Sequence, residues 1–98
     1  MADQVDIVVG QRIRRRRRLM GMTQQDLGAT CGVSFQQVQK YECAQTRVTV
    51  GMLWRLASAL DVDVGYFFNG LPQPSAADLD ASEEPSVARL SLARSSAA

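Results

Sequence analysis

Two helix-start signals lie eleven residues apart in this chain, and they constrain its fold more than any other feature. Thr23 is followed by Asp26 three residues later, and Ser34 is followed by Gln37 at the same spacing. A Ser or Thr with an acid or amide three residues on is typical of a capping box, in which the two residues satisfy each other's backbone N–H groups at a helix N-terminus. Gly32 lies between the signals and favours a tight turn. The pattern predicts two short helices joined by a turn.

The apolar residues on either side of these signals also follow a helical period. Val9, Ile13 and Met20 recur at spacings of four and seven, which predicts an amphipathic helix over 6–20 that ends at Gly21. Another helix is expected over about 50–60, followed by a short turn over 64–69 capped by Asp63. The predicted buried stripe of the helix over 50–60 consists of Leu53, Leu56, Ala57 and Leu60, with Trp54 on or near the same face. The chain contains no run of alternating β-branched residues, so we expect an all-α fold, a compact bundle of five short helices.

Composition sets the boundary of this bundle near residue 71. Aromatic residues stop at Phe68, and Pro72-Gln73-Pro74-Ser75 opens a segment rich in Ser, Ala and acidic residues. We therefore expect one domain over 5–70 and a mostly disordered tail over 71–98.

Several classes of function require residue types or motifs that this sequence does not contain. The chain has no histidine, and its cysteines, Cys31 and Cys43, form no CxxC pair. Hydrolytic triads and Cys/His metal sites are therefore excluded on composition, and no glycine-rich phosphate-cradling motif is present. We expect a protein that is not an enzyme and that needs no cofactor, metal or small-molecule ligand. No apolar run approaches the roughly 18 residues of a membrane span, so a cytoplasmic, nucleoid-associated location is expected.

Positive charge is concentrated near the N-terminus. The chain carries a net charge of +1, but residues 1–22 hold six arginines against two aspartates, and five of the arginines are consecutive, Arg14 to Arg18. Arg17 continues the Val9–Ile13 stripe, so it should point inward, where an unpaired charge is costly. Arg12, Arg14, Arg15 and Arg18 are expected outward, either as a solvated face or, for Arg14 and Arg15, as groups that attract phosphate.

The outward face of the helix over 34–42 is the strongest functional signal. With Val38 and Tyr41 directed to the core, the helical period leaves Phe35, Gln36, Gln39 and Lys40 outside and Gln37 on the flank. This face has no acid. Glutamine can bond adenine, lysine can reach guanine and an apolar side chain can contact a thymine methyl in the major groove. An ordinary helical hairpin is the alternative, but the chemistry of this face favours a helix-turn-helix that reads DNA.

Residues of about 8–70 resemble the phage-repressor/Cro-type helix-turn-helix domain, also called the xenobiotic-response-element family. The resemblance is carried by four motifs, GQRIR at 10–14, GMTQQDLG at 21–28, VSFQQVQKYE at 33–42 and LASALDV at 56–62. It implies a lambda-repressor-like bundle and a transcriptional regulator, here expected to be a repressor. It also implies a homodimer on a two-fold DNA operator.

Roles follow from this resemblance position by position. Thr23 and Gln24 match phosphate-binding positions, and free N–H groups at a helix N-terminus suit an anion. Phe35, Gln36 and Lys40 match base-contacting positions, with Gln37 able to share either task. The resemblance also places Arg47 near the phosphate backbone and pairs Arg17 with Glu42 in an ion pair.

Two residues depart from the family pattern. Ala44 stands where a glycine usually ends the third helix, which should cost on the order of 1 kcal/mol if the site requires a positive φ. Gly28 stands where alanine is preferred within a helix, a mild weakening of similar size.

Part of an aromatic cluster near residue 70 exceeds what one short turn can bury. These residues, our candidates for a homodimer interface, are Tyr66, Phe67, Phe68 and Leu71. The alternative to a DNA-binding regulator is a protein-interaction module or antitoxin-like adaptor with the same fold. Substitutions at Gln36 and Lys40 would distinguish the two.

Overall fold

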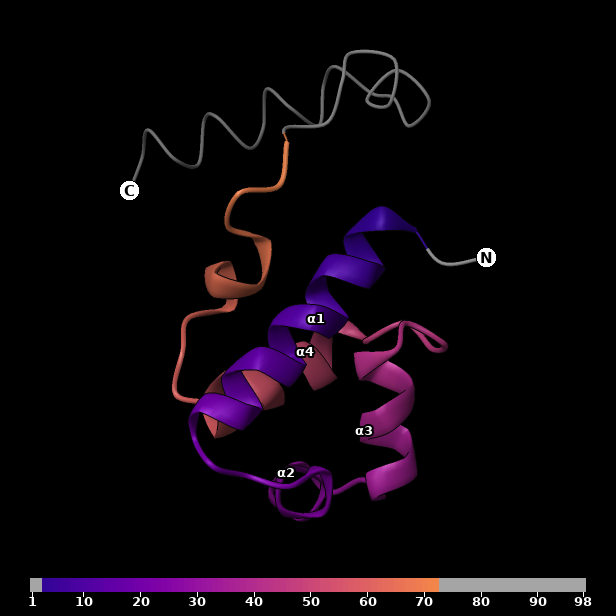
Figure 1. Cartoon of the computed structure of the whole chain (residues 1–98), viewed down its shortest axis with the longest axis vertical. Coiled ribbons are helices and arrows are strands. Elements are labelled where there is room, and N and C mark those ends of the chain that lie inside the picture. Colours follow the sequence, from indigo (N-terminus) through magenta and orange to yellow (C-terminus); the bar gives the residue numbers. More distant parts are fainter. Residues whose placement is uncertain (1–2, 73–98) are drawn as a thin grey trace.

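The computed structural model describes residues 3–72, which form four α-helices and one 3₁₀ helix (Figure 1). The elements are α1 (Gln4–Leu19), α2 (Gln24–Cys31), α3 (Phe35–Glu42), α4 (Val50–Ala59) and the 3₁₀ helix η1 (Val64–Phe68). No strand occurs within residues 3–72, so the all-α prediction is confirmed. The predicted count of five helices is not, because a 3₁₀ turn stands in the fifth place. Of the tail predicted over 71–98, residues 73–98 lie outside the described residues.

The predicted capping box at the start of α2 is complete. The Asp26 N–H donates to Thr23 Oγ1 at 2.9 Å, and the Thr23 N–H donates to Asp26 Oδ2 at 2.9 Å. Hydrogen bonds from the Thr23 backbone and hydroxyl hold the pKa of the Asp26 carboxyl below its usual value. The N-terminus of α2 is therefore fixed by two reciprocal bonds.

Helices α3 and α4 each begin with a single hydroxyl cap. At α3 the Gln37 N–H donates to Ser34 Oγ at 3.1 Å, but Gln37 makes no return bond, so only half of the predicted box is present. At α4 the Met52 N–H donates to Thr49 Oγ1 at 3.1 Å. Asp63 precedes η1 without a side-chain capping bond, so its predicted cap is wrong.

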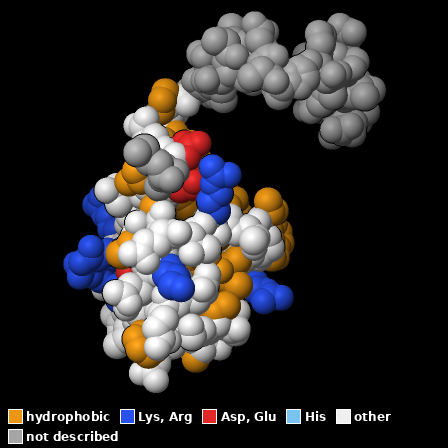
Figure 2. Space-filling model, turned by 90° about the vertical axis from the view of Figure 1, so that its right-hand side faces the viewer, with side chains coloured by type: hydrophobic (Ala, Val, Ile, Leu, Met, Phe, Trp, Pro, Cys, Tyr) orange, Lys and Arg blue, Asp and Glu red, His pale blue; other side chains and the backbone are white. Residues whose placement is uncertain are grey.

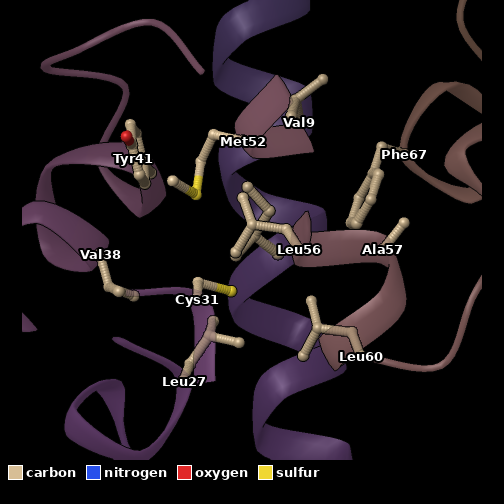
Figure 3. Close-up of a cluster of buried hydrophobic side chains, with 11 residues drawn as sticks. Val9, Leu27, Cys31, Val38, Tyr41, Met52, Leu56, Ala57, Leu60 and Phe67 are labelled. Atoms are coloured by element: carbon tan, nitrogen blue, oxygen red, sulfur yellow. The ribbon is translucent and has the colours of Figure 1, made fainter. Parts of the chain in front are cut away.

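The core collects apolar side chains from all five elements (Figure 3). It consists of Val9, Ile13, Leu27, Cys31, Val38, Tyr41, Met52, Leu56, Ala57, Leu60 and Phe67. Burial raises the pKa of the Cys31 thiol, as expected for a packing residue in apolar surroundings. The predicted inward residues Val9 and Ile13 of α1, and Val38 and Tyr41 of α3, are all in this cluster.

Trp54 was predicted on or near the buried face of the helix over 50–60, but its side chain is 72% exposed. The buried stripe of α4 runs through Met52 and Leu56, and Trp54 lies two residues from each, about 200° around the helix. Met20, predicted on the inner stripe of α1, is 40% exposed because the helix has already ended at Leu19. Leu53 is only partly buried.

Gly28 is required by a close approach and does not weaken the fold as predicted. A Cβ at this position would lie 2.5 Å from the Val33 carbonyl oxygen and 3.2 Å from the Ser34 carbonyl carbon. The turn that leads into α3 therefore packs directly on the α2 backbone. Glycine is what allows the two helices to approach this closely.

Ala44, which stands where the family usually has glycine, adopts the left-handed conformation. Its φ is 61°, in the turn after α3. A Cβ in this region is crowded by backbone and costs about 1–2 kcal/mol. The turn thus keeps the geometry of a glycine turn with a residue that disfavours it.

Candidate nucleic-acid interface

The solvent face of α3 has the composition predicted for it. Phe35 is 45% exposed, Gln36, Gln39 and Lys40 are exposed, and Gln37 is half-buried on the flank. The opposite face buries Val38, Tyr41 and Glu42. Figure 2 shows the side of the molecule on which α3 lies: most side chains there are uncharged, blue Lys and Arg side chains stand apart, and red Asp and Glu side chains are few.

The predicted ion pair between α1 and α3 is present. Arg17 Nε donates to Glu42 Oε2 at 2.6 Å, and Arg17 Nη2 donates to Glu42 Oε1 at 3.1 Å. Both residues are buried, at 8% and 7% exposed. A bidentate pair fixes both distance and direction, so it sets the orientation of α3 on α1.

Two further bonds join this pair to the start of α2. Arg17 Nη1 donates to the Met22 carbonyl at 2.8 Å, and Gln24 Nε2 donates to Glu42 Oε1 at 3.1 Å. Gln24, predicted to bind phosphate, therefore has its amide directed toward Glu42. The N-terminus of α2 and the C-terminal end of α3 are thus held by one polar network.

A groove of about 510 Å³ lies between the end of α1, the start of α2 and α3. The groove is lined by Arg14, Arg17, Arg18, Gly21, Met22, Thr23, Gln24, Gln39, Glu42 and Cys43. Arg14 and Arg18 are exposed at its edge, beside the positive end of the α2 dipole. This arrangement suits an anion such as a backbone phosphate.

The arginines of α1 separate into an exposed group and a group that bonds backbone carbonyls. Arg14, Arg15 and Arg18 are exposed, as predicted. Arg12 is not outward: its Nη1 and Nη2 donate to the carbonyls of Tyr66, at 2.9 Å, and Asn69, at 2.5 Å. The outward prediction for Arg12 is therefore wrong.

Arg16 has a similar role one turn along α1. Its Nε donates to the Leu60 carbonyl at 2.8 Å, at the C-terminal end of α4. Terminal helix carbonyls lack intrahelical partners, so a guanidinium satisfies them well. Arg12 and Arg16 fall three and seven residues after Val9, so the full helical period places both at the edge of the inner face. The same spacing is present in the sequence and indicates that both arginines lie beside the buried stripe of α1.

Arg47, predicted to contact phosphate, has an intramolecular partner. Its Nε lies 3.1 Å from Asp6 Oδ2 near the start of α1, and its side chain is 77% exposed. An exposed pair of this kind contributes little to stability, so Arg47 can exchange partners readily.

The predicted dimer residues near residue 70 are only partly available. Phe67 is fully buried in the core, with its ring 5.6 Å from that of Tyr66 in an edge-to-face contact. Tyr66 and Leu71 are half-buried, and Phe68 is 39% exposed. Phe67 therefore belongs to the fold of a single chain, and its assignment to an interface is wrong.

The helix-turn-helix profile matches residues 13–67, more than half of the chain and all of α2, the turn and α3. The chain belongs to the Cro/C1-type helix-turn-helix family. It is 52% identical over 71 residues to an uncharacterized HTH-type transcriptional regulator of Sinorhizobium fredii, covering 72% of this chain and 50% of that protein. Over 75 residues it is 41% identical to one of Rickettsia conorii, covering 71% and 60% respectively. The chain thus spans about half the length of the first of these relatives.

Solved structures agree with this helix-turn-helix assignment. The restriction-modification controller protein C.AhdI of Aeromonas hydrophila aligns with a TM-score of 0.61 at 31% identity, covering 63% of this chain and 94% of that one. The P22 c2 repressor, solved in complex with a synthetic operator, aligns with a TM-score of 0.59 at 32% identity and the same coverage.

Within residues 3–72 of this helix-turn-helix protein, no helix is long and apolar enough to cross a membrane.

Proposed function

We propose that this chain is a sequence-specific DNA-binding transcriptional regulator that places α3 in the major groove. The observation that carries the proposal is the acid-free outer face of α3, which presents Phe35, Gln36 and Lys40 on a helix whose orientation a buried ion pair fixes. Gln36 would bond an adenine, Lys40 a guanine, and Phe35 would contact a thymine methyl. Gln37, on the flank, would bond either a base or a phosphate.

The groove beside α3 would bind the DNA backbone. Thr23 and Gln24 lie at the N-terminus of α2, where backbone N–H groups attract a phosphate, and Arg14 lies at the groove edge. Arg15 lies on the same exposed side of α1, and Arg47 would leave Asp6 for a phosphate. These contacts would position the protein without reading sequence.

We further propose that the chain acts as a repressor and as a homodimer on a two-fold operator in the cytoplasm. One short helix makes few base contacts, and two copies would read half-sites about 34 Å apart. The similarity to the P22 c2 repressor, which was solved in complex with a synthetic operator, supports the repressor role.

Selection of DNA sites from a random duplex library tests the core of the proposal. We expect an enriched two-fold site. Gln36→Ala and Lys40→Ala should each weaken binding to it by about 1–3 kcal/mol, or roughly 5-fold to 150-fold. Asn69→Ala, a matched change of an exposed amide in the segment after η1, on the opposite side of α1 from α3, should leave affinity unchanged. No enrichment, together with a protein complex that survives both α3 variants, would instead support a protein-interaction module.

The salt dependence of DNA binding tests the proposed phosphate contacts separately. Log affinity falls with log salt by a slope of about 0.9 for each phosphate neutralised on duplex DNA. Arg14→Ala and Arg15→Ala should each reduce this slope by about one. Unchanged slopes would place both arginines on a merely solvated face.

Repression is tested with a reporter gene placed behind the selected site. Expression should fall when the chain is present and recover with Gln36→Ala. A rise in expression on binding would contradict the repressor assignment.

A further inference from the structure

The outer face of α4 presents two large apolar side chains that nothing in the described residues covers. Val50 is 87% exposed and Trp54 is 72% exposed, and they lie one helical turn apart. We call this surface, completed by Ser58 one turn further on, the α4 outer face. A tryptophan that stands in solvent beside another large apolar side chain is typical of a protein contact surface, since aromatic residues dominate interface energetics.

A recess lies directly beside the protruding tryptophan. It has a volume of about 210 Å³ and is lined by Trp54, Ala57, Ser58, Val62, Asp63 and Val64. A second hollow of about 650 Å³ shares Ala57, Ser58, Val62 and Asp63 with it and extends to Tyr66. The same surface therefore offers both protruding apolar groups and a place to receive them.

The charges around this face are also complementary to one another. Arg55 is exposed on α4, whereas Asp61 and Asp63 are exposed just beyond its C-terminus. None of the three forms an ion pair with another described residue. The cation lies at the middle of α4 and the anions lie beyond its C-terminal end. When this surface meets a copy of itself turned by a two-fold axis, the anions of one copy lie over the N-terminal half of the other helix, toward its long arginine side chain.

We propose that a second copy of this chain packs on the α4 outer face, with the two α4 helices antiparallel about a two-fold axis. Trp54 is at the middle of the ten-residue helix, so the two tryptophans meet near the axis. Val50 of each copy then faces the recess at Ser58 and Val62 of the other. Arg55 of each copy lies toward Asp61 and Asp63 of the other. The association itself stands apart from DNA, but its role at a two-fold operator rests on the proposed function.

This assignment moves the dimer surface away from the cluster near residue 70. Phe67 is committed to the core and Tyr66 is half-buried, which leaves Phe68 as the main exposed aromatic there. Phe68 therefore serves as the competing surface in the test.

Trp54 is the only tryptophan in the chain, so its fluorescence reports directly on burial of this face. We expect the emission maximum of the full chain to move to shorter wavelength as protein concentration rises, in step with dimer formation measured by sedimentation equilibrium. Val50→Asp should weaken dimerisation by at least about 100-fold and keep the emission of an exposed tryptophan. The variant should fold, because an acid in the first turn of a helix interacts favourably with its dipole.

Two controls separate this face from others. Leu19→Asp changes an apolar residue that is 68% exposed on α1, and Phe68→Ala removes the competing surface. Both should dimerise like the unmodified chain. A chain that stays monomeric at the highest concentrations, or one whose dimer survives Val50→Asp but not Phe68→Ala, would overturn the proposal.

The ionic part has its own test. Arg55→Asp should weaken the dimer about 10-fold, and adding Asp63→Arg should restore it. A double variant no tighter than the single one would overturn the pairing of these charges across the axis.

A DNA measurement keeps this proposal distinct from the proposed function. Val50→Asp should bind a single half-site like the unmodified chain but lose most of its preference for the full two-fold site. If the chain dimerises through Trp54 but binds no selected DNA, the proposed function fails and the self-association stands.

Discussion

The helices α3 and α4 are built alike but present opposite surfaces to solvent. Each is short, begins after a hydroxyl cap and buries one stripe of apolar residues. The outer face of α3 carries Gln36, Gln39 and Lys40, whereas that of α4 carries Val50 and Trp54. Since the inner faces satisfy the same folding requirement, the two helices differ mainly in the groups that they expose. The proposed DNA contact of α3 and the proposed protein contact of α4 both rest on this difference.

The inner faces differ in one respect that matters for recognition. α4 buries only apolar residues, but α3 also buries Glu42, paired with Arg17. Apolar packing is nondirectional, whereas a bidentate ion pair fixes rotation and position together. A helix that must present hydrogen-bonding groups to bases gains most from the second kind of attachment.

The largest expected effect comes from breaking this pair. Glu42→Ala leaves the buried Arg17 without a counter-charge and should lower the free energy of unfolding by about 3–5 kcal/mol, measured by urea denaturation. The double variant Arg17→Met with Glu42→Leu removes both charges and should regain most of that loss. A single variant within 1 kcal/mol of the unmodified chain would show that α3 is held by apolar packing, as α4 is.

The next effect concerns the two sides of α4. Leu56→Ala should destabilise the fold by about 2–5 kcal/mol because it leaves a cavity in the core, whereas Trp54→Ala should change the stability of the monomer by less than about 0.5 kcal/mol. Thermal unfolding at protein concentrations too low for the proposed dimer to form measures the stability of both variants. A large loss on Trp54→Ala under those conditions would mean that this side chain packs within one chain.

A smaller effect is expected at the contact between α2 and the turn before α3. Gly28→Ala introduces a Cβ 2.5 Å from the Val33 carbonyl oxygen, so the backbone must move, at a cost of about 1–3 kcal/mol. Urea denaturation measures the loss. Gly51→Ala is the control, because this exposed glycine on α4 has nothing within 4 Å of an added Cβ and should be neutral or stabilising.

The smallest effect is a gain. Ala44→Gly relieves the positive φ in the turn after α3 and should raise the free energy of unfolding by about 0.5–1 kcal/mol, after the entropy of the more flexible unfolded chain is subtracted. A rise in melting temperature checks it. A fall would show that the turn relaxes to another path once the methyl group is absent.

Most of the fold could be predicted because its signals are local. Thr23, Ser34 and Gly32 mark helix ends through bonds made within a few residues, and Val38 and Leu56 follow the helical period. The Arg17–Glu42 pair came from family resemblance, because spacing alone gives an inward arginine no partner.

What the sequence missed depends on contacts distant along the chain. Arg12 bonds carbonyls more than fifty residues away, and no local pattern identifies those acceptors. Trp54 was assigned inward because it is large and apolar, although the period of α4 places it outside. Gly28 is explained only by the approach of a neighbouring turn. Each error arose where a residue's type was given more weight than its angular position or its neighbours.

The hydrogen bonds that Arg12 and Arg16 donate to carbonyls of residues 60–69 also determine on which side of α1 the described part of the chain ends. Because their guanidinium groups hold the carbonyls of Leu60, Tyr66 and Asn69, residues 60–70 are fastened along α1, and they lie on the opposite side of it from α3 (Figure 1). A reporter or tether fused after residue 72 would therefore start out directed away from the α3 face. This domain is thus suited to modular fusion, since cargo attached there should not obstruct the proposed DNA-reading surface.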